Sequence, residues 1–345
     1  MALKNVLVTG GFGYVGSRLT PYLLQNGFNV RAIDLNLYGD FGLTGLDSEL
    51  EADQKPRFEF IRGDIRNPDT VAAAMRDIDA VIHLAAISND PTGEVDEILT
   101  RQTNFDAIGV LVATAKKAGV KRFINASSSS VFGIKSDPNV TEALEPEPLT
   151  YYSKYKMLSE WLTITASSEQ FCTVNIRPAT ICGFSPRQRF DLTVNKLTAD
   201  AVKKRVITVH GGEQRRPNVG MTDVVNLYTQ LLKIDAQLIN GRTFNFGFEN
   251  LKVIEIAQLI QSELADLKVE IKVTPTLDNR DYHISSAKIV ETLGYRPVSS
   301  IRDEVRNLRK KLEADYYGDI DADRYYNLKM MKLERSSQPY RFLSR

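Results

Sequence analysis

NVLVTGGFGYVG, residues 5–16, decides the fold class of this chain. Its first five residues form a short apolar run rich in β-forming side chains, and a helical pattern of apolar residues follows the glycines. In such a turn, Gly10 permits the tight bend, Gly13 lets a phosphate approach the backbone, and Gly16 allows the helix to pack closely on the strand. The N-terminus of the helix then faces the phosphates. The stretch therefore predicts the first strand, turn and helix of a dinucleotide-binding domain.

The next strand-like run indicates the type of dinucleotide. Residues 29–33 form this run, and Asp34 follows at its end, near the spacing expected of a ribose-binding acid. A carboxylate accepts hydrogen bonds from both ribose hydroxyls and repels a 2′-phosphate. Leu35-Asn36-Leu37 offers no arginine to hold such a phosphate. The sequence therefore favours NAD over NADP.

Further β-rich runs predict the rest of a parallel sheet, and they lie at residues 57–61, 80–86, 122–126 and 174–178. The run 80–86 is apolar throughout, which is typical of a strand buried on both faces. Its small Ala85 and Ala86 would let a cofactor lie against the backbone, while His83 is expected in the core. Asp64, after the run 57–61, is either an acceptor for an adenine amino group or a turn aspartate.

YSKYK, residues 152–156, carries the candidate catalytic base. Tyr152 and Lys156 lie one helical turn apart, on one face of a helix. Free tyrosine has a pKa of about 10, so base action near pH 7 requires a downshift of roughly 3 units, or about 4 kcal/mol. One lysine does not supply this alone, and an oxidised nicotinamide ring would add a second positive charge. Serines 127–130 precede this stretch, and the residues by themselves do not select one hydroxyl.

Composition excludes several classes of partner. The chain has 44 Lys and Arg against 43 Asp and Glu, so it shows no electrostatic footprint for nucleic acid or an anionic membrane. No apolar run approaches the roughly 20 residues of a membrane-spanning helix. Cys172 and Cys182 are the two cysteines, and we expect buried free thiols in a reducing compartment. A cytoplasmic protein with neither nucleic acid nor membrane as a partner is expected.

The order of the motifs resembles that of the extended short-chain dehydrogenase/reductases, the group of nucleotide-sugar epimerases, dehydratases and reductases. GxxGxxG, the strand-terminal acid, GDI, HLAA and YxxxK follow one another as in that family. The resemblance implies an α/β fold, a Rossmann-type doubly wound parallel sheet with a smaller C-terminal substrate-binding lobe. It places the NAD domain at residues 1–175, with 219–247 returning to it. The substrate lobe then comprises 176–218 and 248–315, and 316–345 form a C-terminal tail.

The resemblance also implies which residues hold NAD. Asp64 contacts the adenine, and Asn104 sits near the cofactor at the start of a long helix. The complete set is Gly10, Phe12, Gly13, Tyr14, Val15, Gly16, Asp34, Asp64, Ile65, Leu84, Ala85, Ala86, Asn104, Tyr152, Lys156 and Pro178.

For catalysis, the family pattern places the active hydroxyl four residues before the aromatic of "VYG", which here is Phe132. This selects Ser128, with Ser129 as the second candidate. Ser128 would hydrogen-bond the reacting sugar oxygen, and Tyr152 would take its proton as hydride leaves the carbon. Lys156 would hold the ribose and lower the tyrosine pKa.

Departures from the family narrow the expected reaction. Ser129 and Ser130 stand where 4,6-dehydratases carry an Asp-Glu pair. The glutamate of UDP-glucuronate decarboxylases and the cysteine of 3,5-epimerising reductases are also missing from this turn. Hydride chemistry at a carbinol remains. A 4-epimerase with tightly held NAD is favoured over a 4-dehydrogenase or 4-ketoreductase with net redox, and over a non-catalytic NAD-binding sensor.

A nucleotide-diphosphate sugar is the expected substrate. Arg216 and Arg280 resemble arginines that grip its phosphates, and Asn195 loosely matches a position that contacts it. Thr180 replaces the asparagine that is usual in the family. Arg187 and Arg189 suit either a diphosphate or a solvated basic face. The family further implies a homodimer, formed through the helices near 104–118 and 152–166.

Overall fold

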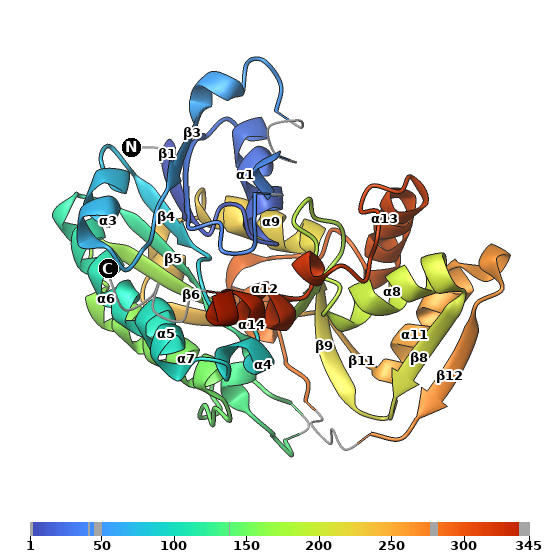
Figure 1. The fold of residues 1–345 in the computed structure, drawn as a ribbon. Coiled ribbons are helices and arrows are strands. Elements are labelled where there is room, and N and C mark those ends of the chain that lie inside the picture. The colour runs from blue at the N-terminus through green and yellow to red at the C-terminus, as the bar shows by residue number, and fades with distance from the viewer. Residues whose placement is uncertain (1–2, 41, 45–49, 138, 277–281, 338–345) are drawn as a thin grey trace.

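A seven-stranded parallel sheet forms the larger part of the molecule (Figure 1). The computed structural model describes residues 3–40, 42–44, 50–137, 139–276 and 282–337. The strand order is β3-β2-β1-β4-β5-β6-β10, and neighbouring strands run parallel. The predicted doubly wound sheet is thus confirmed. Its strands are β1 (Asn5–Thr9), β2 (Asn29–Asp34), β3 (Phe58–Arg62), β4 (Ala80–His83), β5 (Arg122–Ala126), β6 (Cys172–Pro178) and β10 (Arg242–Phe246).

Helices cover both faces of this sheet because its strands carry apolar side chains on both sides. In β1, Val6 and Val8 belong to a core shared with α1 and α9, whereas Leu7 belongs to a core shared with α3 and α6. This alternation is the two-residue period of a strand. The covering helices are α1 (Gly16–Gln25) and α9 (Met221–Leu231) on one face, with α3 (Pro68–Ala74), α6 (Ala107–Lys117) and α7 (Tyr151–Ala166) on the other.

Short elements complete this part. A π-helical turn, Gln102–Asp106, leads into α6. The others are α4 (Asp90–Gly93) and α5 (Glu97–Arg101), which lie beside α7, together with the 3-10 turn Ser129–Phe132, α10 (Ala236–Ile239) and α12 (Ala287–Leu293).

A second part with its own apolar core follows β6. It contains a three-stranded sheet in the order β11-β9-β7 and a parallel pair, β12-β8. The chain leaves it after β9 to form α9 and β10 in the larger part, and then comes back. Its elements are β7 (Thr180–Cys182), β8 (Val206–His210), β9 (Arg215–Gly220), β11 (Glu249–Lys252), β12 (Glu270–Thr274), α8 (Thr193–Lys204), α11 (Val253–Glu263) and α13 (Ile301–Glu313).

The C-terminal segment, residues 316–337, lies where the two parts meet. It contains a 3-10 turn, Asp323–Tyr325, and the helix α14 (Asn327–Ser337). Figure 1 shows α14, in red, across the front of the molecule near α4. For this segment the sequence predicted no regular element.

One predicted strand is shorter than expected. The run 80–86 pairs with β1 only as far as Thr9 opposite His83. Leu84, Ala85 and Ala86 leave the sheet there and form a loop at its carboxyl edge. The strand order reverses between β1 and β4, so this loop stands at the point where open α/β sheets bind their ligands.

Candidate active site

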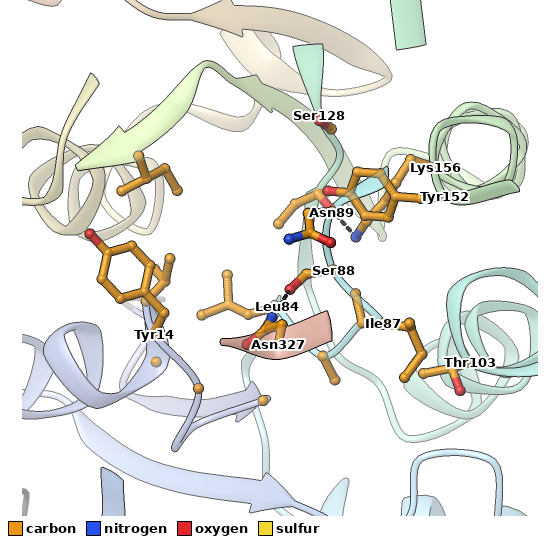
Figure 2. A pocket seen from close by; sticks show the side chains of 18 of the residues that line it. Tyr14, Leu84, Ile87, Ser88, Asn89, Thr103, Ser128, Tyr152, Lys156 and Asn327 are labelled. Carbon is orange, nitrogen blue, oxygen red and sulfur yellow. Dashed lines mark hydrogen bonds between the residues drawn. The ribbon is translucent and has the colours of Figure 1, made fainter. Parts of the chain in front are cut away.

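A cleft opens at the carboxyl edge of the large sheet, where the strand order reverses between the paired strands β1 and β4. Its walls come from the glycine turn after β1, the loops after β2, β3 and β4, the serine turn, α7 and the segment after β6. Figure 2 shows Tyr14 on one side of this cleft and Ser128, Tyr152 and Lys156 on the other. The tertiary structure thus brings the two halves of the predicted site together.

The glycine turn forms a backbone cradle in this cleft. Gly10 has φ +71°, and a Cβ there would lie 2.7 Å from the Ala85 amide nitrogen. A Cβ at Gly16 would collide with the Gly10 carbonyl. Gly10, Gly13 and Gly16 all line the cleft, and α1 begins at Gly16. The roles predicted for the first and third glycines therefore have a direct steric reason.

Asp34 presents a carboxylate at the same end of the cleft. Its Oδ2 accepts a hydrogen bond from the Phe12 amide at 3.0 Å, and its Oδ1 accepts one from the Asn36 amide at 2.8 Å. Burial raises the pKa of Asp34, and these two backbone hydrogen bonds oppose the rise. Each carboxylate oxygen keeps a lone pair for another donor. The pair of ribose hydroxyls of a dinucleotide suits these acceptors.

Two buried polar atoms near Asp34 also fit a polar ligand. Among the described residues, the Tyr38 hydroxyl and Arg187 Nε have no hydrogen-bond partner. Both residues line the cleft. Buried donors are seldom left without a partner in native proteins. Together with the glycine cradle and Asp34, they make the cleft suitable for a dinucleotide with its phosphates.

Most residues predicted to hold the cofactor line this cleft: Tyr14, Val15, Ile65, Leu84, Ala85, Ala86 and Pro178, besides those above. Asp64 lines it too, and there its Oδ1 accepts from the Arg66 amide at 2.9 Å while the two side chains form an ion pair. Asp64 thus makes the contacts of a turn aspartate within the cleft wall, and its contact with an adenine stays a prediction.

Phe12 and Asn104 lie behind the wall. The Phe12 amide donates a hydrogen bond to Asp34, but the Phe12 ring packs edge-on against the Phe60 ring, with 4.6 Å between the ring centroids. Asn104 is fully buried, and its side chain donates to and accepts from the backbone of Ile87 at 2.9 and 2.8 Å. Asn104 thus fixes the loop after β4, while its neighbour Thr103 reaches the cleft.

Helix α7 positions the candidate base. Its N-terminus is fixed by a capping box in which the Thr150 and Ser153 side chains each accept from the other's amide, at 3.1 and 3.0 Å respectively. Tyr152 and Ser128 line the same cleft, and Ser128 Oγ lies 2.9 Å from Ser130 Oγ. Lys156 is buried and donates from Nζ to the Ala126 carbonyl at 2.7 Å. Of the two candidate serines, Ser128 is the one whose side chain lowers the pKa of Tyr152.

Burial dominates the electrostatics of this pair. It raises the pKa of Tyr152 to about 12, although the Ser128 hydrogen bond and the Arg189 charge act in the opposite direction. It also lowers the pKa of Lys156 to about 8, against the attraction of Glu160. The protein's own groups therefore do not give the expected net lowering of the Tyr152 pKa. Desolvation of the phenolate outweighs the nearby charges.

A buried ion pair supports the serine turn from below. Glu160, one helical turn after Lys156, accepts from Arg177 Nε and Nη2 at 2.8 and 2.7 Å. It also accepts from the Ser127 hydroxyl at 2.5 Å. The Arg177 guanidinium lies over the Phe132 ring, 4.7 Å from its centroid. The sequence reading missed Glu160, although its spacing of four residues from Lys156 was a usable signal.

Arg187 and Arg189 are both buried, so neither belongs to a solvated basic face. Arg189 forms a two-pronged ion pair with Asp191, with both hydrogen bonds at 2.9 Å. The Arg187 guanidinium lies over the Tyr38 ring, 4.4 Å from its centroid. Both arginines and Thr180 line the cleft.

Two other predicted substrate residues, Asn195 and Arg216, do not line the cleft. Asn195 is fully buried and hydrogen-bonds the Gly183 amide, the Tyr14 hydroxyl and the Arg189 carbonyl. Arg216 lies over the Tyr282 ring, 5.4 Å from its centroid, and Tyr282 lines the cleft. Arg280 lies outside the described residues.

Several cleft residues carry no motif that sequence reading could use. They come from loops, from short helical turns, from α9 and from the C-terminal segment, and they are Tyr38, Ser88, Asn89, Asp90, Thr103, Tyr228, Tyr282 and Asn327. In the part of the chain that the structure describes, no cluster of His, Cys, Asp or Glu could hold a metal. None of the described helices is long and apolar enough to cross a bilayer.

Comparison with known proteins extends these observations. The model of the NAD dependent epimerase/dehydratase family matches residues 6–247. The chain is 30% identical to an uncharacterised UDP-glucose epimerase, YtcB, of Bacillus subtilis, covering 91% of this chain and 100% of that protein. It is 27% identical to UDP-glucuronic acid decarboxylase 4 of Arabidopsis thaliana, covering 92% of this chain and 71% of that protein.

A solved structure with the same fold is the UDP-glucuronic acid 4-epimerase from Bacillus cereus in complex with UDP-glucuronic acid and NAD. It superposes with a TM-score of 0.79 at 27% identity, over 90% of this chain and 99% of that one. The chain therefore belongs to the NAD-dependent epimerase/dehydratase family of extended short-chain dehydrogenase/reductases, enzymes whose cofactor is NAD.

Proposed function

We propose that the protein is an NAD-dependent nucleotide-sugar 4-epimerase. The observation that carries this proposal is that Ser128, Tyr152 and Lys156 line one cleft. The serine turn that holds Ser128 has no carboxylate of its own. Ser129 and Ser130 occupy the next two positions, so the turn offers no second acid or base for removing water. Asp90 also lines the cleft, but it accepts a hydrogen bond from the Thr150 hydroxyl at 2.6 Å. Tyr152 is left as the main proton handler.

The protein residues have separate tasks in this reaction. Tyr152 takes the proton of the sugar C4 hydroxyl and later gives it back, and Ser128 hydrogen-bonds the same oxygen. Lys156, with a pKa of about 8, is mainly protonated near pH 7 and supplies a positive charge beside the base. The glycine cradle and Asp34 would hold NAD, which would supply a reversible hydride acceptor for C4. Hydride return to the opposite face of the ring would invert the carbon.

The substrate side of the cleft supports a nucleotide-diphosphate sugar. Thr180 and Arg189 line this side, next to Tyr152, and the charge of Arg189 reaches the tyrosine hydroxyl. The UDP-glucuronic acid 4-epimerase of the same fold binds such a sugar. The base and the sugar are left to experiment.

The decisive experiment measures both the sugar products and the net formation of NADH. Purified protein is given UDP-glucose, UDP-N-acetylglucosamine, UDP-glucuronic acid, or a GDP- or dTDP-sugar, and the products are separated by chromatography. We expect C4 epimers to interconvert without net NADH. Stoichiometric NADH would instead identify a 4-dehydrogenase, and oxidation of added NADH by a 4-ketosugar would identify a 4-ketoreductase.

Tyr152→Phe tests the catalytic assignment. We expect this variant to lose turnover by at least about 100-fold, the usual range for losing a general base, while its NAD content stays unchanged. Unchanged turnover would contradict the role of Tyr152. If no nucleotide sugar reacts with either protein although NAD is bound, the sensor interpretation gains.

We also propose that the enzyme is a cytoplasmic homodimer. Trp161 and Ile164 on α7 are exposed apolar side chains on the face that carries α5 and α6 (Figure 1). Burying them against a second copy would remove apolar area from water. Cys172 and Cys182 are buried free thiols, in keeping with a reducing compartment.

A further inference from the structure

The C-terminal segment is fastened to the segment after β7. The Tyr317 hydroxyl donates to the Ser185 carbonyl at 3.0 Å, and the Phe190 amide donates to the Tyr325 carbonyl at 3.1 Å. The Phe190 ring packs edge-on against both tyrosine rings, with centroids 5.3 and 5.1 Å away. Farther along α14, Met331 packs with Ile87 from the loop after β4. The segment therefore joins two walls of the cleft.

Asn327, the first residue of α14, is the point where this segment enters the cleft. It is almost fully buried and belongs to the lining (Figure 2). Its Oδ1 accepts from Arg187 Nη2 at 2.6 Å, and its Nδ2 donates to the Ser88 hydroxyl at 3.0 Å. Its amide donates to Asp191 at 3.2 Å. These contacts set the position of the Arg187 side chain.

Arg187 lies on the cofactor side of the cleft. Its amide is 3.5 Å from the hydroxyl of Ser17, in the first turn of α1, and its guanidinium covers the Tyr38 ring. Its charge also reaches Asp34, the candidate ribose acceptor. Arg189 and Asp191 lie beside it, since Asp191 accepts from the Asn327 amide and Arg189 Nη1 donates to the Ser88 hydroxyl at 3.3 Å.

Arg187 needs an anionic partner more than Arg189 does. Arg189 is paired with Asp191, whereas the side-chain partner of Arg187 in the described part of the chain is the neutral amide of Asn327. Its Nε and the neighbouring Tyr38 hydroxyl are buried without a partner among the described residues. A buried charge is expensive unless it is paired. A pyrophosphate supplies that pairing.

We propose that Arg187 binds the pyrophosphate of NAD, and that Asn327 is a positioning residue through which the C-terminal segment keeps the cofactor bound between turnovers. Arg187 thereby moves from the substrate set, where the sequence placed it, to the cofactor set. The inference rests on NAD as the family's cofactor and is independent of which reaction the enzyme performs.

The rate at which bound NAD exchanges tests this inference without measuring activity. Protein purified with its cofactor is mixed with excess deuterium-labelled NAD, and the label on the protein is followed by mass spectrometry. Loss of a hydrogen bond to a charged group should speed exchange about tenfold or more in Asn327→Ala. Arg187→Met should exchange at least as fast. An apolar residue of similar length at a buried ionic site usually folds well, so this variant serves if Asn327→Ala does not fold.

Two matched variants separate positioning from general loosening. Asn327→Asp places a carboxylate on Arg187 that competes with the pyrophosphate for its charge, so exchange should be accelerated as in Asn327→Ala. Lys329→Ala changes an exposed side chain two residues farther along α14 and should leave the rate unchanged. Native exchange in Asn327→Ala, or an equal acceleration in Lys329→Ala, would overturn the proposal.

A second experiment decides whether Arg187 binds the pyrophosphate of NAD or the diphosphate of the sugar nucleotide. The dissociation constant of UDP is measured by calorimetry on the NAD-loaded native, Asn327→Ala and Arg187→Met proteins. We expect it to change less than about threefold. If it weakens tenfold while NAD exchange is native, Arg187 belongs to the sugar nucleotide and the inference is wrong.

Discussion

Tyr152 and Lys156 share one face of α7, and burial moves their pKa values apart, to about 12 and about 8. In each case burial disfavours the charged form. Near neutral pH the tyrosine therefore holds its proton and the lysine holds its charge. A second positive charge at the cofactor ring favours the phenolate. The base is thus expected to work only in a cleft loaded with oxidised cofactor.

The pH dependence of turnover follows from this pair. The base must be ionised, so kcat/KM should rise with pH through the operative tyrosine pKa. Lys156→Met removes one favourable charge and should move this rise upward by about one unit or more, with a lower rate at pH 7. The displacement is measured from profiles of kcat/KM against pH between pH 6 and 10. Lys154→Met changes an exposed lysine on the same helix, and an equal displacement in that control would contradict the role of Lys156.

His83 is a second buried titratable group. Its Nδ1 lies 2.7 Å from the Thr9 hydroxyl, and burial lowers its pKa to about 3. The unfolded chain takes up a proton there below about pH 6.5, whereas the folded protein does not. Its contribution to stability is therefore complete above about pH 6.5 and is lost as the pH falls toward 3.

His83→Gln should remove this dependence. Between pH 6 and 4, the native protein should lose up to about 1.4 kcal/mol of unfolding free energy per pH unit more than the variant. Urea unfolding at several pH values measures the difference. His210→Gln, at an exposed position, should keep the native slope. Parallel curves for native protein and His83→Gln would refute the explanation.

At the scale of elements, the Glu160–Arg177 ion pair joins α7, β6 and the serine turn. Arg177 comes from β6, Glu160 from α7, and Ser127 donates to the same carboxylate. Thr150 fixes the start of α7. The candidate catalytic tyrosine, lysine and serine are thus held by contacts between elements rather than by their own helix and turn alone.

Removing one partner of this ion pair should be costly. Glu160→Gln leaves Arg177 buried with a neutral neighbour, so the free energy of unfolding should fall by about 3 kcal/mol. Chemical denaturation measures this. Asp106→Asn, which breaks the exposed ion pair with Arg101, should change it by less than about 1 kcal/mol. The double variant Glu160→Gln/Arg177→Met should recover part of the loss. If Glu160→Gln and Asp106→Asn lowered the free energy of unfolding equally, Glu160 and Arg177 would not behave as a buried ion pair.

At the scale of the whole molecule, the cleft is made by segments far apart in the chain, and an outer face stays apolar. Trp161 has 63% of its surface exposed on α7, and Ile98 on α5 has 62%. These side chains lie on the helical layer away from the cleft, beside α6. The proposed dimer would cover this layer and leave the cleft open.

Trp161→Glu should therefore shift the protein toward monomer. A charge in a buried apolar contact weakens it strongly, and sedimentation velocity over a range of concentrations reports the result. The matched change Val273→Glu, at an apolar residue exposed on β12, should leave the oligomeric state unchanged. A native protein that sediments as a monomer at all concentrations would refute the dimer.

The sequence by itself determined the doubly wound sheet, the glycine cradle, the acid at the end of β2 and the Tyr-Lys spacing on α7. All of these depend on periods and turns within a few residues of one another, which local sterics control. Only the tertiary structure decided that Asn195 and Asn104 stand behind the wall. It also decided that Asn327 meets Arg187, 140 residues earlier in the chain. The rise of the Tyr152 pKa is equally a tertiary effect, because it depends on how much water the surrounding chain excludes.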